Sequence, residues 1–204
     1  MNLIFDMYGV IIKESKGNFI PYVYSHFPNT VKSELVGLFN QSNSGKITGN
    51  QFLTTLGFSD ADAITKDYIE NYLTFDNDFY AFAKKYKSLF TFALLSNDVQ
   101  SWSEYITKHY DIDKYFYHKT ISGATGCRKP DTKIYQILLE KTGWNAEDCI
   151  YIDNSVKNLI AASELGMKTI LFNRDNESFD GDIVYSFEEL DLLMERKDVN
   201  GYSN

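Results

Sequence analysis

A single acid close to the start of the chain is the first residue whose type and position could do chemistry. Asp6 directly follows the apolar run Leu3–Phe5, and Gly9 comes three positions later. An acid at the carboxyl end of a first, central strand lies where open α/β sheets build their active sites. The glycine allows a tight exit from the strand. Asp6 is therefore a candidate nucleophile, and the alternative is an acid that caps a turn.

Two further stretches offer neutral hydrogen-bonding groups and a cation. Ser96 and Asn97 end the apolar run LFTFALL, and short hydroxyl and amide groups can hold a phosphoryl oxygen or a carboxylate. The alternative is an ordinary helix N-cap, which these residue types form routinely. Lys129, in the stretch GCRKPD, is a compact charge that suits a phosphate or a nucleophilic carboxylate.

A second strand-terminal acid completes the set. The apolar run Ile150–Ile152 ends at Asp153, and Asn154 follows it. Two carboxylates at neighbouring strand ends form a natural place for Mg²⁺, which prefers oxygen ligands. We expect the carboxylates of Asp6 and Asp153 and the ammonium group of Lys129 to meet in one pocket.

The elements that must position these residues alternate along the chain. Apolar runs predict buried strands at Leu3–Phe5, Leu89–Leu95, Ile150–Ile152 and Thr169–Phe172. Helical spacing predicts helices at Val99–Tyr110, Thr132–Thr142, Val156–Leu165 and Phe187–Arg196. Strands that alternate with helices of this length indicate an α/β fold, with a parallel sheet and crossover helices.

The stretch between the first two predicted strands breaks this alternation. Apolar residues recur there at helical spacing, in Val31–Asn40, Asn50–Leu56 and Ala61–Leu73. The stretch is too long for a loop in a compact domain, which predicts a small helical subdomain. We expect a core domain formed by residues 1–13 and 77–204 and a helical cap domain formed by residues 14–76. The polar residues 198–204 are expected to be loose.

Composition narrows the classes of partner. The chain has 204 residues and a net charge of −8. Such a surface repels nucleic acid and anionic lipid, so we expect neither as a partner, and a phosphate site would need its own positive groups. Two cysteines, no signal peptide and no apolar stretch of membrane-spanning length favour the cytoplasm. We expect a small-molecule substrate and a monomer or homodimer.

In these motifs the chain resembles the haloacid dehalogenase (HAD) superfamily. The resemblance rests on FDMYGV, LLSN, GCRKPDTKIY and YIDNSVKNLIAASELGM, and it covers nearly the whole chain. The segment LFNQSNSGKITGNQFLTTLG is similar to the helical C1 cap of epoxide-hydrolase-like and sugar-phosphatase-like members. This resemblance implies a Rossmann-like, three-layer core with a mostly parallel sheet. It also implies a mobile, four-helix-type cap inserted after the first strand.

The resemblance also implies roles for the residues named above. Asp6 would attack the substrate and form a covalent aspartyl intermediate, which water then hydrolyses. Ser96 and Asn97 would bind the transferred group. Lys129 would hold Asp6, contact the substrate and offset negative charge. Tyr8 stands at the position of the usual catalytic acid and base.

A magnesium ion is the cofactor that the resemblance implies. Its ligands would be Asp6, the backbone carbonyl of Tyr8, and Asp153, with Asn154 at the adjoining position. Asn154 stands where an aspartate is usual, and the loss of that charge should weaken Mg²⁺ binding.

Tyr8 leaves three functions open. Phosphatases of the family carry an aspartate at this position, and a phenol is a poor base at neutral pH. The first hypothesis is a slow, Mg²⁺-dependent phosphatase of a small phosphorylated metabolite. The second is a metal-free dehalogenase-like hydrolase, because that branch carries tyrosine here, although residues 13–80 contain none of the arginine that would capture a substrate carboxylate. The third is a catalytically weakened fold that binds a ligand or partner.

Overall fold

A six-stranded parallel sheet forms the centre of the protein, as described by a computed structural model of residues 1–199, with side chains through Arg196. The strand order is β3-β2-β1-β4-β5-β6, and each neighbouring pair is parallel. The strands are β1 (Asn2–Phe5), β2 (Thr91–Ser96), β3 (Phe116–Ile121), β4 (Cys149–Asp153), β5 (Lys168–Phe172) and β6 (Asp182–Val184). This arrangement confirms the predicted α/β class, and the sheet is parallel throughout rather than mostly so.

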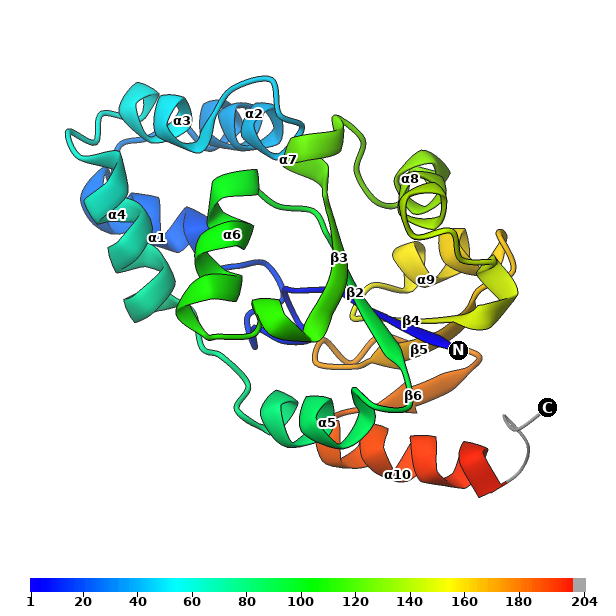
Figure 1. Ribbon diagram of the computed structural model, residues 1–204. Coiled ribbons are helices and arrows are strands. Elements are labelled where there is room, and N and C mark those ends of the chain that lie inside the picture. The colour runs from blue at the N-terminus through cyan, green and yellow to red at the C-terminus, as the bar shows by residue number, and fades with distance from the viewer. Residues whose placement is uncertain (200–204) are drawn as a thin grey trace.

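Helices cover both faces of the sheet and make three layers (Figure 1). Successive residues of β1 serve opposite faces, since Leu3 and Phe5 belong to one hydrophobic cluster and Ile4 to the other. The cluster of Leu3 includes residues of α5 (Asp78–Tyr86), α6 (Gln100–His109) and α10 (Phe187–Val199). The cluster of Ile4 includes residues of α8 (Thr132–Thr142) and α9 (Val156–Ser163). The predicted three-layer core is therefore present.

The strands missed by the sequence analysis are the two edges of the sheet. Strands β3 and β6 have a partner on one side only and are partly exposed, so they lack the continuous apolar run of an interior strand. The prediction for β2 began too early. Leu89 is 64% exposed, and the strand starts at Thr91.

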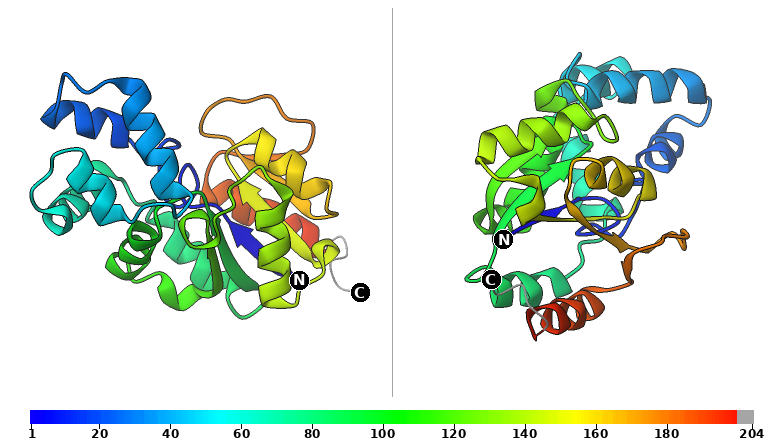
Figure 2. Two further views of the ribbon diagram at one scale, coloured as in Figure 1. Left: turned by 90° about the horizontal axis from the view of Figure 1, so that it is seen from above. Right: turned by 90° about the vertical axis from the view of Figure 1, so that its right-hand side faces the viewer.

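A helical segment lies between β1 and α5 in sequence and forms one end of the molecule (Figure 2). It contains α1 (Phe19–His26), α2 (Lys32–Asn43), α3 (Gly49–Thr55), α4 (Ala61–Asp67) and the π-helix η1 (Tyr68–Tyr72). Its aromatic side chains pack on α6 of the core. The ring centroids of Phe19 and Tyr68 lie 4.9 and 5.1 Å from that of Trp102. Aromatic packing therefore holds the helical segment over the carboxyl edge of the sheet.

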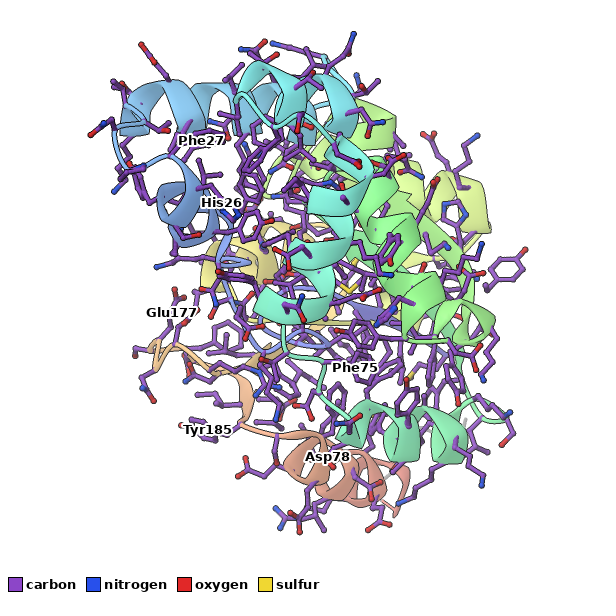
Figure 3. All side chains as sticks on the ribbon, turned by 90° about the vertical axis from the view of Figure 1, so that its left-hand side faces the viewer. His26, Phe27, Phe75, Asp78, Glu177 and Tyr185 are labelled. Carbon is purple, nitrogen blue, oxygen red and sulfur yellow. The ribbon has the colours of Figure 1, made fainter. Side chains whose placement is uncertain are left out.

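Two connections join the helical segment to the core, and they run side by side. The Lys13 N–H donates to the Thr74 carbonyl at 2.9 Å, and the Asp76 N–H donates to the Ile11 carbonyl at 2.9 Å. Phe75 lies on the returning connection, just before α5 (Figure 3). The division into domains at 13/14 and 76/77 falls on these connections and stays a prediction.

The remaining elements are short, apart from the last helix. They are η2 (Asp113–Tyr115), α7 (Ser122–Thr125) and η3 (Ala146–Asp148). Helix α10 continues to Val199, so the prediction of a loose segment is wrong for residues 198 and 199, and residues 200–204 lie outside the described part. No helix within residues 1–199 combines the length and apolar character needed to cross a membrane.

Candidate active site

The predicted residues meet at the carboxyl edge of the sheet because their strands are neighbours. Strand β1 lies between β2 and β4, and Phe5 is level with Leu94 on one side and Ile152 on the other. The residues that follow are therefore brought to the same height. The Asp6 N–H donates to the Ile152 carbonyl at 2.9 Å, which extends the pairing one residue past β1 and fixes the backbone of Asp6.

Lys129 joins the two strand-terminal carboxylates. Its Nζ lies 2.7 Å from Asp6 Oδ1 and 2.8 Å from Asp153 Oδ2, and it donates to the Leu95 carbonyl at 3.0 Å. All three donor positions of the ammonium group thus face an acceptor. Lys129 is 3% exposed, and a charge this deeply buried requires such partners. We call Asp6, Lys129 and Asp153 the strand-tip cluster.

Burial and charge oppose each other in this cluster. Burial raises the pKa of Asp6 to about 7, against the lowering effect of the Lys129 ammonium group. Burial also acts to lower the pKa of Lys129, but the two carboxylates outweigh it, so the net pKa of Lys129 is raised. Lys129 therefore stays charged at neutral pH, while Asp6 is poised to titrate there.

Asp153 is enclosed by donors and does not line the cavity described below. Its Oδ1 accepts from the Ser155 N–H at 2.7 Å, and its Oδ2 accepts from Lys129 and the hydroxyl of Tyr151. The amide of Asn158 lies within 3.1 Å of both oxygens. With both oxygens engaged and the side chain fully buried, Asp153 holds Lys129 in place. The geometry gives no support to its predicted contact with a magnesium ion.

The hydroxyl of Tyr8 is engaged by an acid that the sequence analysis did not select. It donates to Asp98 Oδ1 at 3.2 Å. Asp98 is buried two residues before α6 and also accepts from the Val99 N–H and the Ser103 hydroxyl, at 2.8 and 2.6 Å. Burial raises the pKa of Tyr8 well above its usual value, and the nearby Asp98 carboxylate adds to this effect. An acid after Ser-Asn has the pattern of a helix cap, so only the fold reveals its contact with Tyr8.

Asn97 and Ser96 differ in what their side chains reach. The Asn97 amide brackets the backbone of Lys129, accepting from its N–H at 2.8 Å and donating to its carbonyl at 2.9 Å. It also lines the cavity. The hydroxyl of Ser96 is fully buried without a hydrogen-bond partner among the described residues, and Ser96 does not line the cavity. The predicted contact of Ser96 with a transferred group stays untested.

A cavity of about 310 Å³ opens above Asp6, between the core and the helical segment. Its volume is at the lower end of the range for small-molecule sites. Its lining is Asp6, Tyr8, Ser15, Lys16, Gly17, Phe39, Asn43, Tyr68, Asn97, Arg128, Lys129, Asn154, Ser155, Asn158, Asp175 and Glu177. Glu177 comes from the loop between β5 and β6 (Figure 3). The helical segment thus supplies one wall and the strand tips the floor.

Three acids line the cavity, so its cations are needed if an anion is to bind there. Lys16 and Arg128 line it together with Lys129. The Arg128 guanidinium donates to Asn40 Oδ1 of α2 at 2.7 Å, and because this partner is neutral, the charge of Arg128 is available to an anion. Arg128 directly precedes Lys129 in the motif GCRKPDTKIY, and its role is visible only in the fold.

The oxygen ligands in the cavity fit a magnesium ion poorly. Asn154 lines the cavity, but its amide Nδ2 donates to Asp175 Oδ2 at 3.1 Å. The Asn154 side chain also packs closely against Gly9. A Cβ atom added at Gly9 would lie 2.4 Å from Asn154 Nδ2, so there is no room for a side chain at that position. Within the described residues, no three acids, histidines or cysteines stand together in a metal-binding group. Asp153, which shares Lys129 with Asp6, has both oxygens engaged by protein donors.

Comparison with known proteins identifies the family. The chain matches haloacid dehalogenase-like hydrolase over residues 1–166. It belongs to that family of hydrolases. The glyceraldehyde 3-phosphate phosphatase of Pyrococcus abyssi (strain GE5 / Orsay) is 30% identical over 77 residues, which are 37% of this chain and 32% of that protein. The chain spans about a third or less of the curated relatives that it matches.

Solved structures of the haloacid dehalogenase family share the fold. A variant of the HAD family enzyme BT-2542 from Bacteroides thetaiotaomicron, in complex with magnesium and inorganic phosphate, has a TM-score of 0.72 at 22% identity, and the match covers 88% of this chain and 96% of that one. A HAD phosphatase from Thermococcus onnurineus has a TM-score of 0.73 at 14% identity, with 95% and 97% covered. These likenesses confirm the predicted core fold.

Proposed function

We propose that this hydrolase cleaves small phosphate monoesters with the Asp6 carboxylate as the nucleophile. The observation that carries the proposal is the strand-tip cluster, in which Lys129 holds the Asp6 carboxylate at the floor of a small cavity. Arg128 and Lys16 line the same cavity and supply charge for a phosphate group. The phosphatase that the chain partly matches acts on a small phosphorylated compound, which supports the same substrate class.

The proposed reaction has two displacement steps. An oxygen of Asp6 attacks phosphorus, the bond from phosphorus to the ester oxygen breaks, and the leaving alkoxide takes a proton from solvent water. Water then attacks phosphorus, and inorganic phosphate leaves as Asp6 is regenerated. Lys129 and Arg128 offset the negative charge of the transferred group, and Asn97 positions the Lys129 backbone.

The contact between Tyr8 and Asp98 limits the choice of leaving group. The Tyr8 proton is shared with Asp98, and burial raises the Tyr8 pKa, so this phenol is a poor proton donor to an alkoxide. Esters of acidic alcohols, which leave with little help, should therefore react fastest. The same observation favours one second candidate, dehalogenation of a small haloacid, because halide leaves without a proton and Arg128 could bind the substrate carboxylate.

The proposal includes magnesium dependence, although the cavity offers few oxygen ligands to the ion. A solved relative of the fold contains magnesium and phosphate. In this chain the ion would rely on Asp6, the Tyr8 carbonyl and the neutral Asn154, and this set predicts weak binding. A small-molecule substrate, a monomer or homodimer and a cytoplasmic location complete the proposal.

One assay set tests the reaction. Hydrolysis of p-nitrophenyl phosphate is measured with and without Mg²⁺, for the wild type and for Asp6→Asn. We expect Asp6→Asn to lower kcat/KM at least about 10³-fold, since it removes the nucleophile. Asp180→Asn makes the same chemical change at an exposed acid and should leave the rate unchanged. Retained activity in Asp6→Asn would refute the proposal, and halide release from 2-haloacids without metal would favour the second candidate. No turnover on either substrate class, in a folded protein, would favour a binding function.

A second variant tests the role given to Tyr8. Tyr8→Asp places a carboxyl group where family phosphatases carry one, so turnover of alkyl phosphates should rise about tenfold or more. Tyr8→Phe is the matched control, because it removes the phenol hydroxyl without adding an acid. The measurement is kcat on alkyl phosphates in the presence of Mg²⁺, which offsets the added charge beside Asp6. An unchanged or lower rate for Tyr8→Asp would contradict the assigned role.

A further inference from the structure

The wall of the cavity that comes from the helical segment contains an amide oxygen without a partner. Asn43 is the last residue of α2, and it is 2% exposed. Its Oδ1 is buried and has no hydrogen-bond partner within the described part of the chain, although the side chain lines the same cavity as Asp6 and Lys129. A buried polar group without a partner destabilises a fold, so its presence beside a cavity points to a ligand that completes it.

The hydroxyl groups of this wall already donate hydrogen bonds within the protein. The hydroxyl of Ser15 donates to Asp175 Oδ1 at 2.7 Å, and the hydroxyl of Tyr68 donates to the Gly17 carbonyl. Phe39 adds an aromatic surface to the wall. Asn43 is thus the uncharged hydrogen-bonding side chain that this wall, as described, leaves for a ligand.

The chemistry of an amide selects the ligand group. The phosphate end of a substrate belongs near Lys129 and Arg128, and a phosphate dianion offers no donor to an amide oxygen. The group that meets Asn43 must therefore come from the organic part of the substrate. A hydroxyl group both donates and accepts, so it can pair with either end of the amide, whereas an ammonium group would serve the oxygen alone.

We propose that Asn43 is a specificity-determining residue that binds a hydroxyl group on the organic part of the substrate. The preferred substrates are small hydroxylated phosphate monoesters. This inference rests on the proposed function for the phosphate end of the ligand and deepens it. An analogue that fills the cavity without a hydroxyl group leaves the amide unpaired, and sites built in this way discriminate strongly against such analogues.

Binding to a protein that cannot turn over tests the inference apart from the reaction. In the Asp6→Asn protein, calorimetry measures the affinities of glycerol 3-phosphate and n-propyl phosphate, which differ in their hydroxyl groups. We expect the glycerol ester to bind at least about tenfold more tightly, which corresponds to one hydrogen bond of about 1.4 kcal/mol. Adding Asn43→Leu should reduce this preference to about twofold or less. Adding Gln41→Leu, at an exposed amide of the same helix, should leave it unchanged.

Stability separates a specificity residue from a structural one. Because Asn43 Oδ1 has no partner, replacing the residue by leucine removes an unpaired polar group, and the melting temperature should stay equal or rise. Asn43→Asp keeps acceptor oxygens, so it should retain part of the hydroxyl preference. Its negative charge should lower the affinity for both phosphate esters. A lower melting temperature for Asn43→Leu would show a structural role and overturn the inference.

The remaining outcomes are also decisive. Equal affinities for the two esters, no binding of either, or an unchanged preference in Asn43→Leu would overturn the inference. If the wild type fails to hydrolyse both p-nitrophenyl phosphate and glycerol 3-phosphate while the hydroxyl preference persists, the proposed function fails and the role of Asn43 stands.

Discussion

The floor and the wall of the cavity differ in how completely their polar groups are paired. On the floor, the Lys129 ammonium group faces three acceptors, and both oxygens of Asp153 accept hydrogen bonds from the protein. On the wall from the helical segment, Asn43 Oδ1 is buried and has no partner among the residues that the structure describes. The difference indicates a division of labour. The paired ammonium group of Lys129 and the paired carboxylate of Asp153 support the fold and hold Asp6 in place, whereas an unpaired wall group has its partner on the ligand.

The largest expected effect comes from breaking the floor at its cation. Lys129→Met leaves Asp6 and Asp153 buried without their shared partner, so we expect a loss of about 3–5 kcal/mol in the free energy of unfolding. Urea denaturation monitored by circular dichroism measures it. Lys133→Met, at an exposed lysine of α8, is the matched control and should change stability little. A Lys129→Met protein as stable as the wild type would show that the floor does not depend on this ion pair.

The sequence predicts the floor because each of its residues lies at, or within three residues of, the end of a regular element. Asp6 and Asp153 end apolar runs, and Lys129 precedes a helix whose predicted bounds match the observed α8. In a parallel sheet such positions converge on one edge, and this does not depend on the conformation of the loops. The four interior strands were found for the same reason. The edge strands β3 and β6 were missed, because partial exposure removes the continuous apolar pattern.

The wall could not be predicted in this way. Asn43 lies in the helical segment. It lines the same cavity as Asp6 because helices far apart in sequence pack on α6. Arg128 lies in the motif GCRKPDTKIY, and Asp98 directly follows the motif LLSN. Their partners, Asn40 and Tyr8, come from other parts of the chain, and local spacing does not reveal which side chains will meet.

The second expected effect is a pH dependence of the rate, which arises at the floor and not at the wall. Burial raises the Asp6 pKa to about 7, and only the ionised carboxylate can act as a nucleophile. The value of kcat/KM should therefore fall about tenfold for each pH unit below 7 and level off above it. The hydroxyl preference given to Asn43 should not change with pH, because neither an amide nor an alcohol titrates in this range.

Rates measured between pH 5 and 9 with p-nitrophenyl phosphate test the floor. Affinity ratios for glycerol 3-phosphate and n-propyl phosphate over the same range test the wall. A rate that stays flat down to pH 5 would contradict the raised pKa of Asp6. An affinity ratio that follows the rate would show that floor and wall act as one unit.

The smallest expected effect concerns the side of the floor where Asn154 meets Asp175. Asn154→Asp adds a charged oxygen ligand beside Asp6, so the Mg²⁺ concentration for half-maximal activity should fall about tenfold. The new carboxylate would lie near Asp175, since the present amide is 3.1 Å from that carboxylate, and repulsion should lower stability until magnesium is added. Asp175→Asn combined with Asn154→Asp exchanges the two groups and should restore stability without metal. Magnesium titrations of activity and of melting temperature follow both effects. If the half-maximal concentration is unchanged in Asn154→Asp, this position does not contact the ion, and the poor fit of the floor to magnesium has another cause.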